Sequence, residues 1–507
     1  MRRVAVAATG PVAVDAALGA VRAGGNAVDA ALAAMATAMV TEPGIVSPMG
    51  GAYVTVWPAD GEPEVIDGNV DMPGRGLAPD RFGGGLKEFA LTYGGGITVY
   101  AGPGSVATPG TFAAMGLAHE RHGAGEWSRV MCDATKAAGE GFHLGRAAAS
   151  YLALTTDNIF GWDEETREAM TRDDYSAFIA GDRIVSPDLA QSLALIGERG
   201  WREVYTGEIG RALAADQAAR GGLITEADLA GYEAVVRTPL RLHAGEWDIA
   251  TNPPPSVGGP MLAVMLGELV ARGGTAWRDV IEVQKHVLTY RTDVHDFSPN
   301  LEDDGYRMLE EVRRKGLAGL TTSASTASVS AVDSDGTACA VTASSGYGSG
   351  ATVPGTGLML NNCLGEPELN RLGLHVLTPG TRLASNMAPS VGRASDGRVM
   401  AIGTPGADRI TTALMQVLAR HCILGIDLGE AIGRSRAHVR VVRGEATRVD
   451  FERDAEIADA VTSLGLPGLE HDPHAMYFGG VGAAALSASG VLSAAGDPRR
   501  EAATGVA

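Results

Sequence analysis

The sequence has few cysteines and an excess of acidic over basic side chains. The four cysteines among its 507 residues lie far apart and form no C-x-x-C motif; they are Cys132, Cys339, Cys363 and Cys422. We therefore predict free thiols, buried or partly buried, rather than a disulfide framework or a zinc site. The 60 acidic and 41 basic side chains give a formal net charge of −19. This charge argues against nucleic acid and anionic membrane surfaces as partners.

Long hydrophobic runs are also missing. The longest apolar stretch, residues 27–40, contains Asp29 and is too short to span a bilayer. The N-terminus reads MRRVAVAATGPVAVDAAL, where polar and turn residues soon interrupt the apolar segment. It is therefore a poor secretory signal. These features predict a reducing, cytoplasmic setting and no membrane partner.

Several familiar catalytic and binding motifs are missing as well. The chain has neither a G-x-S-x-G elbow nor a Walker loop, and its glycine clusters at 83–85 and 94–96 lack the strand–glycine–helix context that phosphate binding requires. Two short histidine pairs have no clear third ligand: His119 and His122 in HERH, and His471 and His474 in HDPH. Surface or loop histidines explain these pairs better than a metal site, so we expect neither a metal nor a cofactor.

What is present is a change of character along the chain. The first part favours helices, with polar helices up to about residue 235; the clearest candidates are residues 11–23, 26–41, 261–270 and 277–317. Two strands about an Asp-Gly turn are expected within residues 53–67. From Thr326 onward small and β-branched residues alternate, and the turn Asp333–Gly336 predicts a hairpin. The pattern indicates an α+β protein, built as one large domain or as two.

The run SASTASVS, residues 323–330, precedes this hairpin and is rich in hydroxyl groups. A hydroxyl needs a neighbouring base to act as a nucleophile, and a threonine at the start of a chain can use its own α-amine. Such a threonine arises when the hydroxyl attacks the preceding carbonyl and the backbone is cut. The alternative is a serine-rich loop that only leads into the hairpin. The residues alone favour the loop, and Ser323, Ser325, Thr326 and Ser328 are locally indistinguishable.

Ordered motifs along the whole chain decide between these readings. They include AGGNAVDAALA (23–33), EPGIVSPMGGAY (42–53), PPPSVGGPML (253–262), SAVDSDGTACAVT (330–342), GTPGADRITTALMQV (403–417) and AAGDPRR (494–500). In these motifs the chain resembles the γ-glutamyltranspeptidase family of N-terminal-nucleophile hydrolases. The resemblance implies a four-layer αββα sandwich formed by residues 1–507 as a single fold. It also implies self-cleavage into segments 1–325 and 326–507, which stay associated and leave a homo-oligomer of such pairs open.

The resemblance assigns the catalytic residues. The family nucleophile lies seven residues before the first Asp of the D-x-D-G turn, which gives Thr326 here and a cleavage site between Ser325 and Thr326. The next family residue is commonly a second Thr, whereas this chain has Ala327. The GTPGAD loop aligns with the oxyanion loop, so the donors would be the backbone N–H groups of Gly406 and Ala407, where the family has Gly-Gly. Ser344 falls near a family Thr that positions the nucleophile.

The substrate-binding residues are retained unevenly. Where the family has an Arg that binds the substrate α-carboxylate, in a D-F-R-E pattern, this chain has Asn69; Arg75 is near but would need a different loop path. The family's N-N-Q/E-x-x-D appears as Asn361 to Glu366, in which Asn362 is kept, Cys363 replaces a polar contact and Glu366 could keep the charge that meets the α-ammonium. Ser385 and Asn386 match a Ser-Ser pair that holds the carboxylate. Turn capping is the alternative role for these polar loop residues.

These departures leave several functions open. The main prediction is a self-processing threonine hydrolase that attacks an amide or related acyl bond of a small non-glutathione substrate through an acyl-enzyme on Thr326. A true γ-glutamyltransferase or glutathione hydrolase is the first alternative. A natural-product biosynthetic specialist, such as a C–C bond hydrolase in an alkylproline pathway, is the second. A non-catalytic scaffold that never cleaves itself is the third.

Overall fold

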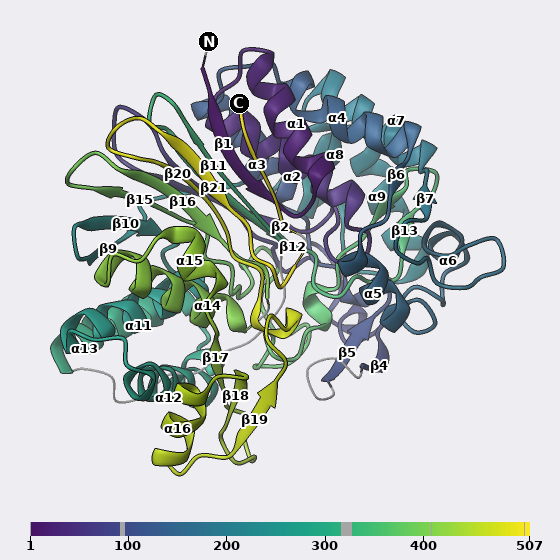
Figure 1. The fold of residues 1–507 in the computed structure, drawn as a ribbon. Helices are drawn as coiled ribbons and strands as arrows, with labels where there is room; N and C mark the ends of the chain where they lie inside the picture. The colour runs from purple at the N-terminus through teal and green to yellow at the C-terminus, as the bar shows by residue number, and fades with distance from the viewer. Residues whose placement is uncertain (1, 92–96, 316–326, 407, 501) are drawn as a thin grey trace.

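The computed structural model describes residues 2–91, 97–315, 327–406, 408–500 and 502–507. Two antiparallel sheets stack face to face at its centre (Figure 1). The first has seven strands in the order β22 (Ala503–Val506), β1 (Val4–Ala8), β11 (Ala327–Asp333), β12 (Ala338–Ser344), β2 (Gly51–Trp57), β3 (Glu64–Gly68) and β8 (Val235–Arg237). The second has six, in the order β21 (Leu492–Ala495), β20 (Gly482–Leu486), β16 (Val399–Gly403), β15 (Ser390–Ala394), β10 (Trp247–Thr251) and β9 (Leu240–Ala244).

Small side chains fill the space between the sheets. The buried cluster there includes Ala5, Ala340, Ala401 and Ala484, together with the β-branched Val332 and Val391. Alanine-rich inner faces let the two sheets approach closely, and this explains why the chain is so rich in alternating small residues.

Helices cover both outer faces of the sandwich (Figure 1). On the first sheet lie α1 (Pro11–Arg22), α2 (Ala27–Thr41) and α3 (Thr111–His122), with α4 (Trp127–Glu140), α7 (Pro187–Arg199), α8 (Glu203–Thr206) and α9 (Glu208–Arg220) near them. On the second lie α11 (Gly258–Arg272), α14 (Arg409–Leu418) and α15 (Leu428–Gly433), while α12 (Trp277–Asp293) and α13 (Leu301–Lys315) pack on α11, and α16 (Ala455–Ser463) packs on α12. This is the predicted four-layer αββα architecture.

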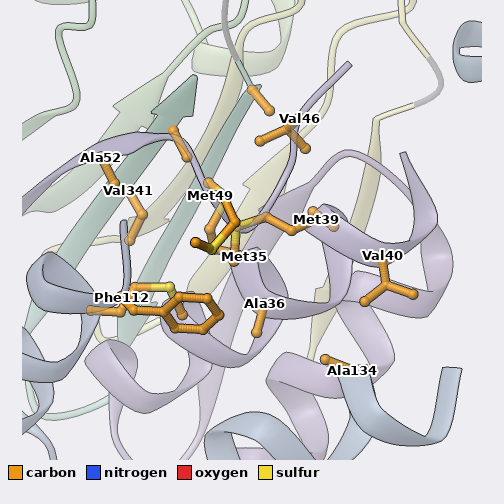
Figure 2. Packing of buried hydrophobic residues seen from close by; sticks show 14 of the residues in the cluster. Met35, Ala36, Met39, Val40, Val46, Met49, Ala52, Phe112, Ala134 and Val341 are labelled. Carbon is orange, nitrogen blue, oxygen red and sulfur yellow. The ribbon is translucent and has the colours of Figure 1, made fainter. Parts of the chain in front are cut away.

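The buried helix predicted at 26–41 is confirmed as α2. Asn26 caps it, because its side chain accepts hydrogen bonds from the N–H groups of Val28 and Asp29 while Asp29 bonds back to the Asn26 N–H. All fifteen residues of α2 are buried. Figure 2 shows Met35 and Met39 of this helix beside Met49, under the strands that carry Ala52 and Val341. Flexible methionine side chains can fill the irregular space between a helix and a twisted sheet.

The predicted hairpin at Asp333–Gly336 is also confirmed. It joins β11 to β12, and the Asp333 carboxylate accepts hydrogen bonds from the N–H groups of Asp335 (3.1 Å) and Thr337 (3.0 Å). Gly336 has φ 92°, a conformation that favours glycine.

The two strands expected within residues 53–67 are confirmed as β2 and β3, but the expectation of helices from there to about residue 235 is incomplete. That region also contains the strand pairs β4 (Lys87–Leu91) with β5 (Ile97–Ala101) and β6 (Phe142–His143) with β7 (Arg183–Ile184). Short strands such as Phe142–His143 carry too few residues for a period of two to show. The remaining elements are α5 (Arg146–Thr155), α6 (Glu164–Met170), α10 (Glu226–Ala230), β13 (Thr352–Val353), β14 (Leu358–Met359), β17 (Ala437–Arg440), β18 (Arg448–Glu452) and β19 (Gly468–His471).

The four cysteines are free thiols, three of them buried and Cys132 partly exposed, as predicted. In the part of the chain that the structure describes, no helix combines the length and the apolar character needed to cross a membrane.

Candidate active site

The candidate site lies at one end of the stacked sheets. There β11 begins at Ala327 and β12 ends at Ser344, which pairs with Gly51 at the start of β2. In the second sheet β16 ends at Gly403, where an added Cβ would lie 2.0 Å from Oγ of Ser328. Because only glycine permits this approach, the loop that follows β16 is held against the start of β11.

The predicted nucleophile Thr326 lies outside the described residues, as do Ser325 and Ala407. Ala327, the next residue after Thr326, is buried and opens β11. The sequence therefore places Thr326 immediately before a strand in the middle of the first sheet. The loops described below surround the point where that strand begins.

Residues 404–406 form the loop to which the sequence assigns the oxyanion donors. Gly406 has φ 135°, and a Cβ there would lie 2.8 Å from Cα of Gly479. The Thr404 hydroxyl donates to the Pro405 carbonyl (2.7 Å) and accepts from the Gly480 N–H (3.0 Å). The position of Gly406 thus requires glycine, and side-chain bonds tie the loop to the segment at 479–480.

A buried charge cluster anchors the chain just after this loop. The Asp408 carboxylate pairs with Arg409 and lies 3.3 Å from Nε2 of His438. Burial alone would raise the pKa of Asp408, but the charges of Arg409 and His438 hold it well below its ordinary value. Asp408 therefore stays ionised at neutral pH and fixes the chain next to the predicted oxyanion donors.

A buried polar corner follows β12. The Asn362 side chain accepts a hydrogen bond from the Tyr347 N–H (2.6 Å) and donates to a main-chain carbonyl (3.0 Å). Gly346 has φ 62°, and a Cβ there would lie 2.2 Å from Oδ1 of Asn362 and 2.8 Å from Oε1 of Glu366. The Gly346 N–H donates to Oγ of Ser344 (3.2 Å). Three predicted site residues, Ser344, Asn362 and Glu366, therefore meet around one tight turn.

Glu366 is a buried acid without a counter-ion among the described residues. Its side chain is 1 % exposed, and Oε2 has no hydrogen-bond partner in the described part of the chain. Burial, reinforced by the nearby Glu368, raises the pKa of Glu366 well above its ordinary value. Cys363 packs with Val70 and Leu383 in a small apolar cluster, and burial raises the pKa of its thiol. The thiol thus contributes to packing at this position.

Asn69 follows the end of β3 and is held by main-chain contacts. Its side chain donates to the carbonyl of Leu383 (2.8 Å), and its own carbonyl accepts from the Tyr232 hydroxyl (2.5 Å) and from Arg382 (2.6 Å). Asn69 is 3 % exposed. The amide therefore joins β3 to the segment that leads to Ser385.

The guanidinium of Arg382 lies beside Asn69, but it already forms ion pairs with carboxylates of the protein. Arg382 pairs with Asp71 (2.9 Å) and lies 3.4 Å from Asp67, while Arg237 also pairs with Asp67 (2.7 Å). Burial raises the pKa of Asp71 to about 6, although Arg382 opposes this. Two acids and two arginines thus balance here. Arg75 lies elsewhere, over the Gly380 backbone and 3.7 Å from Asp228.

Ser385 and Asn386 lie in the loop before β15. The Ser385 carbonyl accepts from the N–H groups of Val257 (2.8 Å) and Gly258 (3.0 Å) at the start of α11, and its hydroxyl accepts from the Met387 N–H (3.3 Å). The Asn386 side chain accepts from Arg291 (2.6 Å), which in turn pairs with Asp296 (2.8 Å). Both predicted residues are buried, and both brace the loop.

Sequence reasoning missed Arg382, Arg291 and His438. Arg382 comes from a loop, Arg291 from α12 and His438 from β17, so tertiary contacts alone bring them near the predicted residues. No local pattern around them differs from an ordinary surface arginine or histidine. Burying an arginine costs free energy unless a partner compensates its charge. The partners of these residues are distant in sequence, so no local signal could have identified them.

The histidine pairs have structural partners. His119 bonds the Gly125 carbonyl (3.0 Å), His122 pairs with Glu64 (2.9 Å), and His471 stacks on Tyr477. Within the described ranges no group of three or more His, Cys, Asp or Glu side chains is placed to hold a metal ion.

Comparisons with known proteins identify the family and the fold. A family model described as gamma-glutamyltranspeptidase matches residues 13–507. The glutathione hydrolase proenzyme of Pseudomonas aeruginosa is 30 % identical over 459 residues, which cover 82 % of this chain and 79 % of that protein. The acylase ACY 1 proenzyme of Pseudomonas sp. strain SE83 is 29 % identical over 448 residues, covering 82 % and 78 %. The cephalosporin acylase structure from Bacillus halodurans superposes with a TM-score of 0.81 at 22 % identity, covering 99 % and 96 %.

Proposed function

The chain belongs to the gamma-glutamyltranspeptidase family of N-terminal-nucleophile hydrolases, and from that premise we propose that it is a self-processing threonine hydrolase whose amide substrate carries an acyl group other than γ-glutamyl. Thr326 is the nucleophile in this proposal. Gly406 and Ala407 supply the oxyanion donors, and Ser344 positions the nucleophile.

Processing comes first. The Thr326 hydroxyl attacks the Ser325 carbonyl, the backbone C–N bond breaks, and water hydrolyses the resulting ester to leave a free α-amine on Thr326. Segments 1–325 and 326–507 then stay together. The first sheet supports this association of the two segments. In it, β11 of the second segment pairs with β12 of its own segment and with β1 of the first segment. The second sheet is likewise shared, since β10 of the first segment pairs with β15 of the second.

Catalysis follows the same chemistry on a substrate amide. The Thr326 hydroxyl attacks the carbonyl while its α-amine takes the proton, and the N–H groups of Gly406 and Ala407 stabilise the oxyanion. The C–N bond breaks, the α-amine returns the proton to the leaving amine, and water releases the acyl group. The fixed loop at 404–406 supports this role, since donors that need no reorganisation stabilise the transition state best.

One observation carries the choice of acyl group: the position of the family's carboxylate-binding Arg is occupied by Asn69, and the adjacent Arg382 is already paired with Asp67 and Asp71. A hydrogen bond to a charged group contributes about 1.5–3 kcal/mol, so its loss weakens the binding of an α-carboxylate about 10- to 100-fold. Burial also favours the protonated form of Glu366. Among the described residues around Asn69 and Glu366, there is therefore neither a free cation for a carboxylate nor a ready anion for an ammonium.

The experiment is a matched substrate series with one leaving group. Purified, processed protein is assayed with the 4-nitroanilides of γ-glutamic acid, glutaric acid and pentanoic acid. These acyl groups have the same chain length, and they lose the ammonium and then the carboxylate in turn. We expect kcat/KM for the pentanoyl compound to exceed that for the γ-glutamyl compound by at least about tenfold. A γ-glutamyl preference would overturn the proposed acyl class while leaving the nucleophile intact.

The alternative is a true γ-glutamyl enzyme, favoured by the retained acid Glu366 and by the name of the P. aeruginosa relative. It requires Glu366 to ionise when an ammonium arrives, and a γ-glutamyl preference in the same series would establish it. A C–C bond hydrolase of an alkylproline pathway stays a prediction from the sequence.

A further inference from the structure

A small pocket opens beside the start of β11, on the side away from Asn69 and Glu366. It lies between the ends of β1 and β20 and the loop after β16. Its lining includes Thr9, Ala327, Ser328, Pro405, Gly480 and Arg500. Because Ala327 and Pro405 both border it, this pocket adjoins the start of the strand behind Thr326 and the predicted oxyanion loop.

Arg500 is the unusual member of this lining. Its aliphatic stem lies over Gly480, where an added Cβ would be 2.8 Å from Cδ of Arg500. Nε is sealed from solvent without a hydrogen-bond partner, and within the described ranges no carboxylate pairs with the guanidinium. Its neighbour Arg499 differs, since it bonds Glu452 (2.7 Å) and Asp497 (3.0 Å).

An unpaired guanidinium in this chain calls for an explanation. The protein has 60 acidic and 41 basic side chains, so partners are plentiful. Burying a donor without a partner costs about 1–3 kcal/mol, a cost that a bound anion would remove. The Thr9 hydroxyl oxygen is also buried without a described hydrogen-bond partner, in the same pocket. Two polar atoms in the lining of one pocket, Oγ1 of Thr9 and Nε of Arg500, are thus buried without a hydrogen-bond partner among the described residues.

We propose that this pocket binds the leaving group of the substrate and that Arg500 recognises a carboxylate on the departing amine. This inference rests on the proposed function, because it takes Thr326 as the reacting residue. A guanidinium fork matches a carboxylate in bidentate geometry, and the Thr9 hydroxyl can donate to the same group.

The remaining lining limits the part of the ligand that the pocket admits. The pocket offers about 30 Å³ of open space, and Ala8, Ile45, Ala327 and Ala502 make its other walls apolar, so only a small part of the leaving group enters it. Glu42 also borders the pocket, is buried, and has an interaction of its own. Its carboxyl group disfavours a second anionic group, so we assign one carboxylate to each leaving group.

The assignment to the leaving group follows from the sheet order. In the first sheet β11 lies between β1 and β12. Asn69, Ser344 and Glu366 lie on the β12 side, where the family resemblance places the acyl group. Arg500 and Thr9 lie on the β1 side. The two halves of an amide extend in opposite directions from the carbonyl that is attacked, so the β1 side receives the amine.

The test measures binding without turnover. The probes are 5-amino-2-nitrobenzoate and 4-nitroaniline, two aromatic amines that differ by one carboxylate. Their dissociation constants are measured by calorimetry or ligand-detected NMR on wild type, Arg500→Gln, Arg500→Lys and Arg81→Gln. The last variant removes the same charge from an exposed arginine outside the pocket.

We expect wild type and Arg81→Gln to bind the carboxylate-bearing amine at least about tenfold more tightly than 4-nitroaniline. Arg500→Gln should abolish this preference, and Arg500→Lys should retain part of it. Equal binding of the two amines by wild type, or a preference that survives in Arg500→Gln, would overturn the proposal.

A parallel assay separates this proposal from the proposed function. The 4-nitroanilide and 3-carboxy-4-nitroanilide of one acyl group are hydrolysed by wild type and Arg500→Gln, and the KM ratio is compared. If the protein neither processes nor turns over amides but still binds the carboxylate through Arg500, the nucleophile assignment fails and the anion site stands. If turnover is normal and the KM ratio is the same in wild type and Arg500→Gln, the leaving-group site is wrong and the proposed function stands.

Discussion

Strand β11 begins at Ala327 and lies between β1 and β12. The polar side chains on the β1 side of this point differ from those on the β12 side in the partners they have. On the β12 side, Asn69, Asn362 and Asn386 all bond main-chain groups or arginines of the protein itself. Oε2 of Glu366, on the same side, has no hydrogen-bond partner among the described residues, and burial favours the neutral form of this acid. On the β1 side, Arg500 has no such partner among the described residues. The difference teaches that buried polarity near a reacting group is not itself a sign of ligand binding. Groups that already have partners maintain the architecture, and a group without one is available to a ligand.

The largest expected effect is on the free energy of unfolding, when the paired Arg382 of the β12 side is replaced. Arg382→Met leaves Asp67 and Asp71 buried without that partner, and breaking such a pair costs about 3–5 kcal/mol of unfolding free energy. Arg500→Met removes a buried donor that has no described partner, so it should leave the unfolding free energy unchanged or raise it. Urea unfolding of both variants at pH 7 checks the contrast. Equal destabilisation would show that Arg500 is also structural.

The next effect concerns the oxyanion loop. Gly406→Ala forces a side chain into a backbone with φ 135° and against Gly479. Displacing one oxyanion donor lowers kcat about 10²- to 10³-fold. Steady-state kinetics measures the loss, and a cooperative thermal transition, even at a lower temperature than in wild type, shows that the variant is folded. Wild-type kcat in a folded Gly406→Ala protein would place the oxyanion donors elsewhere.

A third effect depends on pH. Burial raises the pKa of Asp71 to about 6, so between pH 4 and 6 the folded state binds more protons than the unfolded state. This contribution is fully present below pH 4 and is lost as pH rises through 6. It amounts to about 2–3 kcal/mol, from about two pKa units at 1.36 kcal/mol each. Unfolding free energies of wild type and Asp71→Asn, measured from pH 4 to 7, should therefore shift in favour of the variant by this amount. A constant difference would contradict the assigned pKa.

The smallest expected effect sharpens the acyl side. Asn69→Arg restores a guanidinium at the family position, at some cost in stability because Arg382 is adjacent. The ratio of kcat/KM for γ-glutamyl to pentanoyl 4-nitroanilide should rise about tenfold. Asn69→Gln, which adds length without charge, is the matched control. The same ratio in both variants would mean that this position does not contact the acyl group.

The residues alone predicted the α+β class and several of its elements because those signals are local, and the four layers came from the family resemblance. The buried helix at 26–41 is apolar on nearly every face, and the Asp-Gly hairpin after β11 has alternating strands on both sides. Family motifs added the order of the layers and named Ser344, Asn362 and Glu366, which the structure brings around one turn.

The rest could not be read from the sequence, because it depends on long-range contacts. Arg382 reaches Asp67 and Asn69 across more than 300 residues, and His438 reaches Asp408 from β17, a strand outside the two central sheets. Arg500 is the last residue of the AAGDPRR motif and follows Arg499, whose guanidinium bonds Glu452. Only the coordinates separate the two, since the difference lies in which carboxylates come near.

The most direct test of the account is the intact mass and N-terminal sequence of purified wild type beside Thr326→Ala. The account predicts that wild type forms two chains, residues 1–325 and 326–507, which copurify and show Thr326 as a new N-terminus, while the variant remains one chain. Wild type that stays uncut after long incubation, or a cut at any other hydroxyl of residues 323–328, would contradict the assignment of Thr326 as the nucleophile.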